Sequence, residues 1–226
     1  MKTLRQAFVV MRKDLRAEWR TKETLNAAVS FSISVLLLFS FALDPTPEQT
    51  MEIGGGILWM IFLFAGTLVF NRSFARELPN DCLDALVASP ASSAAIFLGK
   101  CFAGFSMMLI VEVLSLPMFQ MFFGGRIMDH PLHLAMTLLL GTWSVTIMGT
   151  TFSALTVNLR LRELMLPVLV YPMLLPAMLA SFKLLTTLVS GQPIGQEDAQ
   201  WLRVLFGFDL MFTCLALAMT DSILIN

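Results

Sequence analysis

The sequence predicts an all-α integral membrane protein with six transmembrane helices. Of its 226 residues, 57% are hydrophobic and only 14% are charged, whereas a soluble domain carries about 25% charged residues. Mean hydropathy is +0.76. Several apolar runs reach the roughly 20 residues that a helix needs to cross a bilayer. We therefore expect one transmembrane domain over residues 1–226, with most of its surface facing lipid.

Each expected span is an apolar window bounded by polar or charged residues. The first two windows contain no charged residue, whereas the third has Lys100 near one end and Glu112 inside it. The sixth contains Asp209 and Asp221. Windows of this length and hydropathy are typical of helices that cross a membrane. The six expected spans are 27–43, 53–70, 94–123, 134–157, 164–182 and 204–225.

The distribution of basic residues predicts the orientation of these spans. Twelve of the 15 Lys and Arg residues fall before the first span, between spans two and three, or between spans four and five, if Lys100 at the start of the third span is counted with the second of these segments. Because basic residues are enriched in the cytoplasmic connections of membrane proteins, we expect those three segments, and both termini, to be cytoplasmic. In a bacterium the membrane would be the inner membrane.

Residues 1–23 predict an amphipathic helix ahead of the first span. Leu4, Phe8, Met11, Leu15 and Trp19 recur at spacings of four, three, four and four, which places them on one helix face. Basic residues cover much of the remaining surface. Such a helix is typical of the membrane interface, with its aromatic residue at headgroup depth. The alternative is a solvated helix packed on a partner protein.

The polar interval between spans two and three predicts a second amphipathic helix. Asn80 can cap its start and Pro90 ends the run. Leu83, Leu86 and Val87 then share one face, three and four residues apart. A short helix tethered by two spans can transmit force from a soluble protein to the membrane. An ordinary connecting loop with one interfacial helix is the alternative interpretation.

Three stretches of the chain resemble the CcmB family of haem exporter proteins. They are KDLRAEWRTKETLNAAVSFSISVLLLFSFAL, GGGILWMIFLFAGTLVFNRSFARE and DCLDALVASPASSAAIFLGK, at residues 13–43, 54–77 and 81–100. The resemblance covers essentially the whole chain. The layout is also similar to that of ABC-2 type permeases, which have an interfacial N-terminal helix, six spans, and a coupling helix between spans two and three.

The resemblance implies a function in cytochrome c biogenesis. Proteins of this family are membrane subunits that pair with the ATPase subunit CcmA and work beside CcmC, CcmD and the periplasmic haem chaperone CcmE. ATP hydrolysis would drive either haem export or release of the haem-loaded chaperone. Haem would then be a transported or handled ligand, and a second copy of the chain is expected. The alternatives are a scaffold subunit that moves no substrate and a proton-coupled secondary transporter.

The same resemblance places the contact with the ATPase in the interval between spans two and three. Glu77, Asp81 and Asp84 would face basic residues of the ATPase, and the N-terminal helix would lie beside them. The expected coupling residues are Phe74, Arg76, Glu77, Asp81, Leu83, Asp84, Leu86 and Pro90.

The sequence contains no nucleotide-binding motif of the GxxxxGK[ST] type, since Gly99-Lys100 is followed by Cys101. If ATP drives this protein, ATP binds to another chain, and we expect a transporter subunit rather than an enzyme. The three cysteines are far apart and form no CxxC, which argues against a disulfide framework or a metal site. The basic residues belong to the topology signal, so nucleic-acid binding is not expected.

Two carboxylates and two histidines are further candidates for function. Glu112 lies near the middle of the third span, where an ionisable group is costly unless it has a partner. It would either line a cavity used in transport or bond a hydroxyl such as that of Ser115 or Thr142. Asp209 raises the same question, although it is expected near the outer end of its span. His130 and His133 are candidates for haem contact, and a plain interfacial role is the alternative.

Overall fold

The computed structural model describes residues 2–43, 46–78, 82, 86, 88–124, 126–157, 159 and 161–224. Within these ranges the chain is helical and contains no strand. Six of the helices are long and apolar enough to cross a membrane, which confirms the predicted fold class. The elements are α1 (Lys2–Thr21), α2 (Glu23–Leu43), α3 (Pro47–Ser73), η1 (Ala75–Glu77), α5 (Ser93–Phe123), α6 (Pro131–Thr156), α7 (Arg162–Val189) and α8 (Ala199–Leu224).

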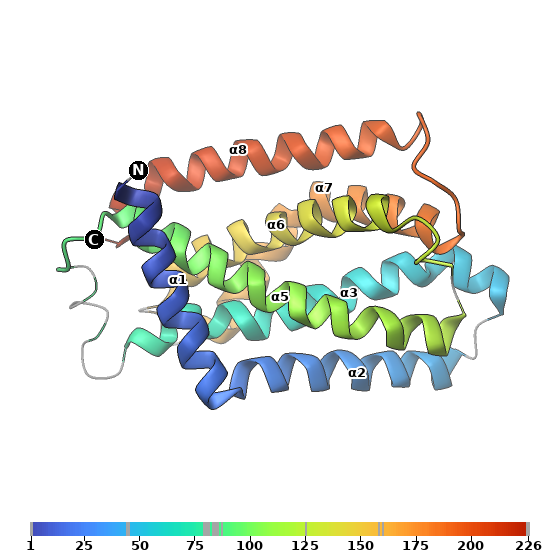
Figure 1. Ribbon diagram of the computed structural model, residues 1–226, viewed down its shortest axis with the longest axis horizontal. Helices are drawn as coiled ribbons and strands as arrows, with labels where there is room; N and C mark the ends of the chain where they lie inside the picture. Colours follow the sequence, from blue (N-terminus) through green and yellow to red (C-terminus); the bar gives the residue numbers. More distant parts are fainter. Residues whose placement is uncertain are drawn as a thin grey trace.

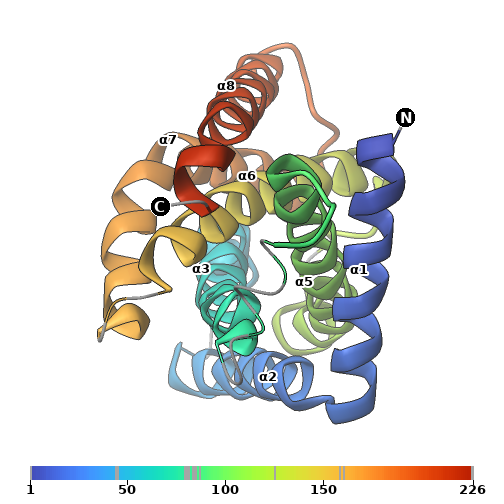
Figure 2. The same ribbon diagram turned by 90° about the vertical axis from the view of Figure 1, so that its left-hand side faces the viewer.

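The six long helices form a bundle, and α1 lies across one end of it (Figures 1 and 2). Both ends of the chain lie at that same end of the bundle (Figure 1), as an even number of spans requires. Helices α3, α5 and α6 are the most buried, whereas α2 and α8 leave most of their surface exposed. Because lipid is as apolar as these side chains, an exposed apolar surface is expected for the outer helices of a membrane bundle.

Glycine and aromatic residues fit together in the core of the bundle. Trp59 and Phe70 are almost completely buried. Trp59 lies against Gly141, and Phe70 lies against Gly104 and Gly149, at positions where a Cβ atom would collide with the ring. Small residues of this kind allow membrane helices to approach closely. The large rings of α3 therefore fill spaces that glycines of α5 and α6 leave open.

The helices are longer than the apolar windows that predicted them. Helix α3 begins six residues before the window, because Thr46 and Gln49 form a reciprocal capping box at its start. Helix α7 continues to Val189, beyond the expected end at residue 182, and Thr187 there donates to the carbonyl of Lys183 within the helix. Polar residues of this kind extend a helix while lowering the hydropathy on which the windows depend.

The second amphipathic helix predicted between spans two and three falls mostly outside the described residues. Pro79, Asn80, Asp81, Leu83, Asp84 and Val87 are among the residues whose structure is not described. The described ends of the interval are η1 and the N-terminus of α5, where Ser92 caps the helix by accepting from the backbone N–H of Ala95. The coupling helix therefore stays a prediction, but both of its attachment points are defined.

Candidate functional site

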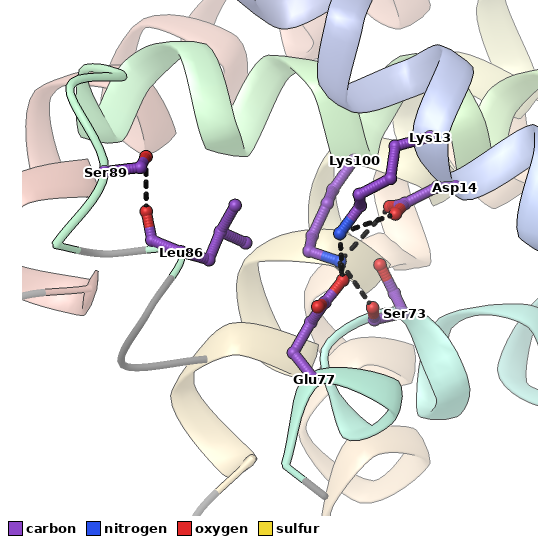
Figure 3. Close-up of polar contacts among 7 residues, drawn as sticks. All are labelled: Lys13, Asp14, Ser73, Glu77, Leu86, Ser89 and Lys100. Atoms are coloured by element: carbon purple, nitrogen blue, oxygen red, sulfur yellow. Dashed lines mark hydrogen bonds and ion pairs between the residues drawn. The ribbon is translucent and has the colours of Figure 1, made fainter. Parts of the chain in front are cut away.

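A cluster of charged residues lies where α1, η1 and α5 meet, at the end of the bundle that α1 crosses. We call it the junction. Three segments that are far apart in sequence contribute to it, and Figure 3 shows the side chains of its first half pointing toward one another. Its members are Lys13, Asp14, Glu18, Arg76, Glu77 and Lys100.

Lys100 is the centre of the junction. Its side chain is 1% exposed, and its Nζ lies 3.2 Å from Asp14 Oδ2 and 3.1 Å from Glu77 Oε1. It also donates to the carbonyl oxygen of Ser73 at 2.8 Å (Figure 3). That carbonyl belongs to the last turn of α3, where helix carbonyls have no partner within the helix. One ammonium group therefore joins α1, α3, η1 and α5.

Lys13 completes this half of the junction from the side of α1. Its Nζ lies 2.5 Å from Glu77 Oε1 and 3.2 Å from Asp14 Oδ1. The ammonium groups of Lys13 and Lys100 and the carboxylates of Asp14 and Glu77 therefore surround one point, and their formal charges add to zero. Burial alone would lower the pKa of Lys13, but the carboxylates of Asp14 and Glu77 raise it above its ordinary value. Lys13 therefore stays charged at physiological pH.

The second half of the junction is built on Glu18, whose side chain is almost fully buried. Arg76 of η1 forms an ion pair with Glu18 and donates to Thr24 Oγ1 at 2.6 Å. The other oxygen of Glu18 accepts from the backbone N–H of Leu25 at 2.8 Å, in the first turn of α2. Glu18 therefore holds η1 against the turn that joins α1 to α2, where Lys22 has a positive φ of 53°.

The Glu18 carboxylate should make stability depend on pH. Burial would raise its pKa, but the bonds from Leu25 and Arg76 lower it below the ordinary value of 4.5. A lowered folded-state pKa stabilises the fold above the ordinary value, and this stability is lost as the pH falls through the folded-state pKa. We expect Glu18→Gln to be less stable than the wild type at pH 7 and nearly equal to it well below pH 4. Thermal unfolding of both proteins across this range checks this, and a pH-independent difference would contradict it.

The junction changes the role expected for three predicted coupling residues. Phe74 is fully buried, with its ring 4.9 Å from Lys100 Nζ, so it does not face a partner. Arg76 and Glu77 are paired within their own chain. The Glu77 carboxylate is paired with Lys13 and Lys100 of its own chain, and its contact with basic residues of another protein stays a prediction.

The remaining coupling residues divide between described and undescribed positions. Pro90 is exposed and Leu86 is half-buried. The carbonyl of Leu86 accepts from Ser89 Oγ at 2.7 Å (Figure 3), and that of Pro90 accepts from Gln6 of α1 at 3.1 Å. Asp81, Leu83 and Asp84 lie outside the described residues. Helix α1 therefore contacts both ends of the interval between α3 and α5.

Glu112 lies fully buried inside the bundle and bonds a hydroxyl of the neighbouring helix. Thr142 of α6 donates to Glu112 Oε1, whereas Ser115 donates to the carbonyl of its own helix. The second oxygen of Glu112 has no hydrogen-bond partner among the described residues. No Lys or Arg pairs with Glu112 in the described part of the chain, so this carboxyl is linked to α6 through a single neutral donor.

Asp209 of α8 is also buried. Ser144 of α6 donates to Asp209 Oδ1 at 2.5 Å, and the adjacent Trp143 donates to Thr213 Oγ1 at 3.0 Å. Three consecutive residues, 142–144, therefore connect α6 to α5 on one side and to α8 on the other. Thr142 was one of the two hydroxyls expected for Glu112 from the sequence, whereas no local pattern indicated the pair of Ser144 and Asp209, which are 65 residues apart.

The Thr142–Glu112 bond should contribute measurably to stability. Thr142→Val removes the one described donor of a buried carboxyl, and an unsatisfied buried polar group costs about 1–3 kcal/mol. We expect the free energy of unfolding to fall by that amount. Thr151→Val is the matched control, because the Thr151 hydroxyl bonds only the carbonyl of Ile147 in its own helix. Unfolding by SDS titration measures both variants, and equal stabilities would contradict the expectation.

The two histidines lie at the start of α6, at the end of the bundle opposite to α1. Their rings are 6.0 Å apart and both residues are half-buried. His130 precedes the helix and makes no side-chain cap. Among the described residues, no group of three or more His, Cys, Asp and Glu side chains is placed to hold a metal ion. A role for His130 and His133 in haem contact stays a prediction.

Comparison with known proteins shows the family. The sequence profile described as CcmB protein matches residues 5–226. The chain belongs to the CcmB family. It is 30% identical over 195 residues to the haem exporter protein B of Rhodobacter capsulatus, covering 86% of this chain and 84% of that protein. It is 29% identical over 199 residues to the protein of the same name from Pseudomonas aeruginosa, covering 88% of each.

The match to Escherichia coli is shorter. There the chain is 28% identical over 94 residues to haem exporter protein B, which is 42% of this chain and 43% of that protein. The CcmB profile matches residues 5–226. This range includes every residue of the junction and the contacts of α6 with α5 and α8.

Proposed function

We propose that this CcmB-family chain is the membrane subunit of a haem export complex and that an ATPase on a separate chain drives it. Membership of the CcmB family and similarity to haem exporter proteins B support the haem role. The observation that carries the coupling role is the junction. It attaches both ends of the interval between α3 and α5 to α1 through buried ion pairs.

The junction is suited to receive force because its members are fixed to several helices at once. A push on the interval acts on η1 at one end and on the start of α5 at the other. Glu77 and Lys100 connect these two ends directly, with their charged atoms 3.1 Å apart. Breaking a buried ion pair costs several kcal/mol, so α1, η1 and α5 should move together.

Helix α5 can carry that movement into the membrane. Its 31 residues form one helix, which at 1.5 Å per residue extends about 46 Å. Glu112 lies along this helix and is bonded to α6. A displacement at the junction would therefore reach the α6 contacts to α8 through a continuous set of packed helices.

The ATPase itself would be CcmA, bound at the cytoplasmic interval, because this sequence has no phosphate-binding loop of its own. CcmC, CcmD and the chaperone CcmE would be further partners, and two copies of this chain would face two ATPase subunits. In this orientation the junction and both termini are cytoplasmic, and the membrane is the bacterial inner membrane. The Lys and Arg distribution supports this placement.

Two uses of the ATP energy fit this arrangement: movement of haem across the membrane, or release of the haem-loaded chaperone. Proteoliposomes that carry the complex, with ATP inside and CcmE outside, distinguish these two uses. Haem export predicts ATP-dependent haem appearance outside without CcmE. Chaperone release predicts that haem transfer needs CcmE and that ATP increases only the free chaperone. A scaffold or a proton-coupled transporter would show no dependence on ATP hydrolysis in either arm.

Charge reversal at two acidic residues of the interval tests the contact with the ATPase. Asp84→Lys should lower ATPase stimulation while leaving thermal stability unchanged, because Asp84 would face the partner. Glu77→Lys should lower both, because it places a cation beside Lys13 and Lys100. Stimulated ATPase activity and thermal unfolding of the purified complex measure this, with Glu52→Lys near the start of α3 as the control. Unchanged stimulation in Asp84→Lys would contradict the proposed contact.

A further inference from the structure

Helix α1 presents three different faces. The face against α5 has small and acidic residues, with Ala7 fully buried and Val10 packed against Gly99. A second face is apolar but exposed. A third face is basic and also exposed. The residues of the apolar face that are most exposed are Leu4, Phe8 and Trp19, at 63%, 59% and 69%.

The basic face forms a shallow groove on the outer side of α1. Arg12, Arg16 and Arg20 line it at intervals of four residues, beside Lys13. All three arginines are exposed. None of their guanidinium groups forms an ion pair or hydrogen bond with another residue in the described part of the chain, although the acidic residues on the α5 side of the same helix are fully paired.

Three arginines at this spacing, without an acidic partner among the described residues, form a surface that favours an anion from outside the chain. Like charges four residues apart on a helix repel each other and destabilise it. The same helix uses Asp14 and Glu18 for the junction instead of placing them between the arginines. An anion bound along the groove would offset the repulsion, and guanidinium groups bind phosphate oxygens in pairs.

The neighbouring apolar face indicates which anion this is. Phe8 and Trp19 lie on the side of α1 next to Arg12 and Arg16 by helical spacing, and more than half of the surface of each is exposed in the described structure. An exposed apolar face beside an exposed basic face is typical of a helix in the headgroup layer. An acidic protein surface would match the arginines but would leave the apolar residues in water.

We propose that Arg12, Arg16 and Arg20 form a binding site for the phosphate groups of anionic phospholipids, which holds α1 at the membrane surface. This site is independent of the haem role and of the ATPase. The bound lipids would fix α1 from outside while the junction fixes it from inside. The movement of the junction would then depend on the lipid composition of the membrane.

Binding of fluorescent phosphatidylglycerol to the purified full-length protein in neutral detergent tests the site. Each basic residue near an anionic surface contributes about 1 kcal/mol, so the triple variant Arg12→Gln, Arg16→Gln, Arg20→Gln should bind about 100-fold more weakly. Wild-type binding should weaken with added salt. Arg203→Gln is the control, since Arg203 is exposed at the far end of the bundle. Phosphatidylcholine should bind weakly to every variant.

Further measurements distinguish anionic phospholipid from the other anions that the groove could bind. Inorganic phosphate should compete poorly, and equal competition would assign the site to free phosphate. If the triple variant binds phosphatidylglycerol as the wild type does but loses co-purified ATPase, the arginines of the groove contact an acidic protein and the proposal is wrong. Thermal unfolding in neutral detergent should be no lower for the triple variant, because repulsion is relieved. If it is lower, each single variant should still weaken lipid binding about fivefold, and no weakening would overturn the proposal.

Discussion

Lys100→Met is expected to be among the most damaging single substitutions outside the core of the bundle. Methionine fills a similar volume but removes the buried cation, so Asp14 and Glu77 are left with Lys13 as their one described cation and the cluster is no longer neutral. Removing one partner of a buried ion pair costs about 3–5 kcal/mol. We expect the free energy of unfolding to fall by this amount and α1 to detach from α5. SDS titration measures the first effect, and protease accessibility of α1 measures the second.

A second substitution shows whether the loss is due to charge. Adding Glu77→Gln to Lys100→Met removes one of the two carboxylates and restores neutrality with Lys13 and Asp14, so part of the stability should return. Arg203→Gln is the matched control for loss of a cation, since that residue is exposed and should change stability by less than about 0.5 kcal/mol. A Lys100→Met protein as stable as the wild type would contradict the structure of the junction.

Gly99→Ala is expected to displace α1 without unfolding the bundle. A Cβ atom at this position would lie 2.6 Å from Val10 Cβ and 2.7 Å from the carbonyl oxygen of Ala7. Both atoms are part of α1 or fixed closely to it, so no single side chain can move aside and the helix itself must shift. We expect the junction distances to lengthen and ATPase stimulation to fall at least tenfold, while the protein still inserts into the membrane.

Gly56→Ala is the matched control for this substitution. Gly56 lies within α3, and a Cβ atom there would have no neighbour within 4 Å. Because alanine favours a helix over glycine by roughly 1 kcal/mol, this variant should be slightly more stable than the wild type and fully active. Cross-linking between cysteines introduced into α1 and α5 reports the displacement. Equal cross-linking yields in Gly99→Ala and the wild type would show that α1 does not pack as described.

The spans could be predicted from the sequence because each depends only on local composition. A window such as 53–70 is apolar regardless of what surrounds it, and a bilayer requires about that length. The presence of an amphipathic helix ahead of the first span also followed from a local pattern. The pattern of Leu4, Phe8 and Trp19 did not indicate which face of α1 packs against the bundle. The face against α5 is formed by small residues, because close packing at Gly99 requires them.

The junction could not be predicted because its contacts join residues far apart in the chain. Asp14 and Lys100 are separated by 86 positions, and Glu18 and Arg76 by 58. The one local signal was Lys100 itself, a charge within an apolar window, which requires a partner when it is buried. Glu77 was assigned to a partner protein because the family resemblance places the ATPase contact in its polar interval, and nothing local indicated Lys13 and Lys100 as its counter-ions. Exposure cannot be deduced from polarity when the chain supplies its own counter-ions.

The central claim is that α1, η1 and α5 move as one body when the ATPase binds ATP. Double electron–electron resonance in the reconstituted complex tests this claim by measuring the distance between spin labels at Val9 in α1 and Ser92 before α5. The exposed Cys82 and Cys214 are first replaced by serine. We predict one narrow distance, unchanged between the nucleotide-free and ATP-bound states, and a broad distribution in Lys100→Met. A wild-type distance that changes with ATP would contradict the account.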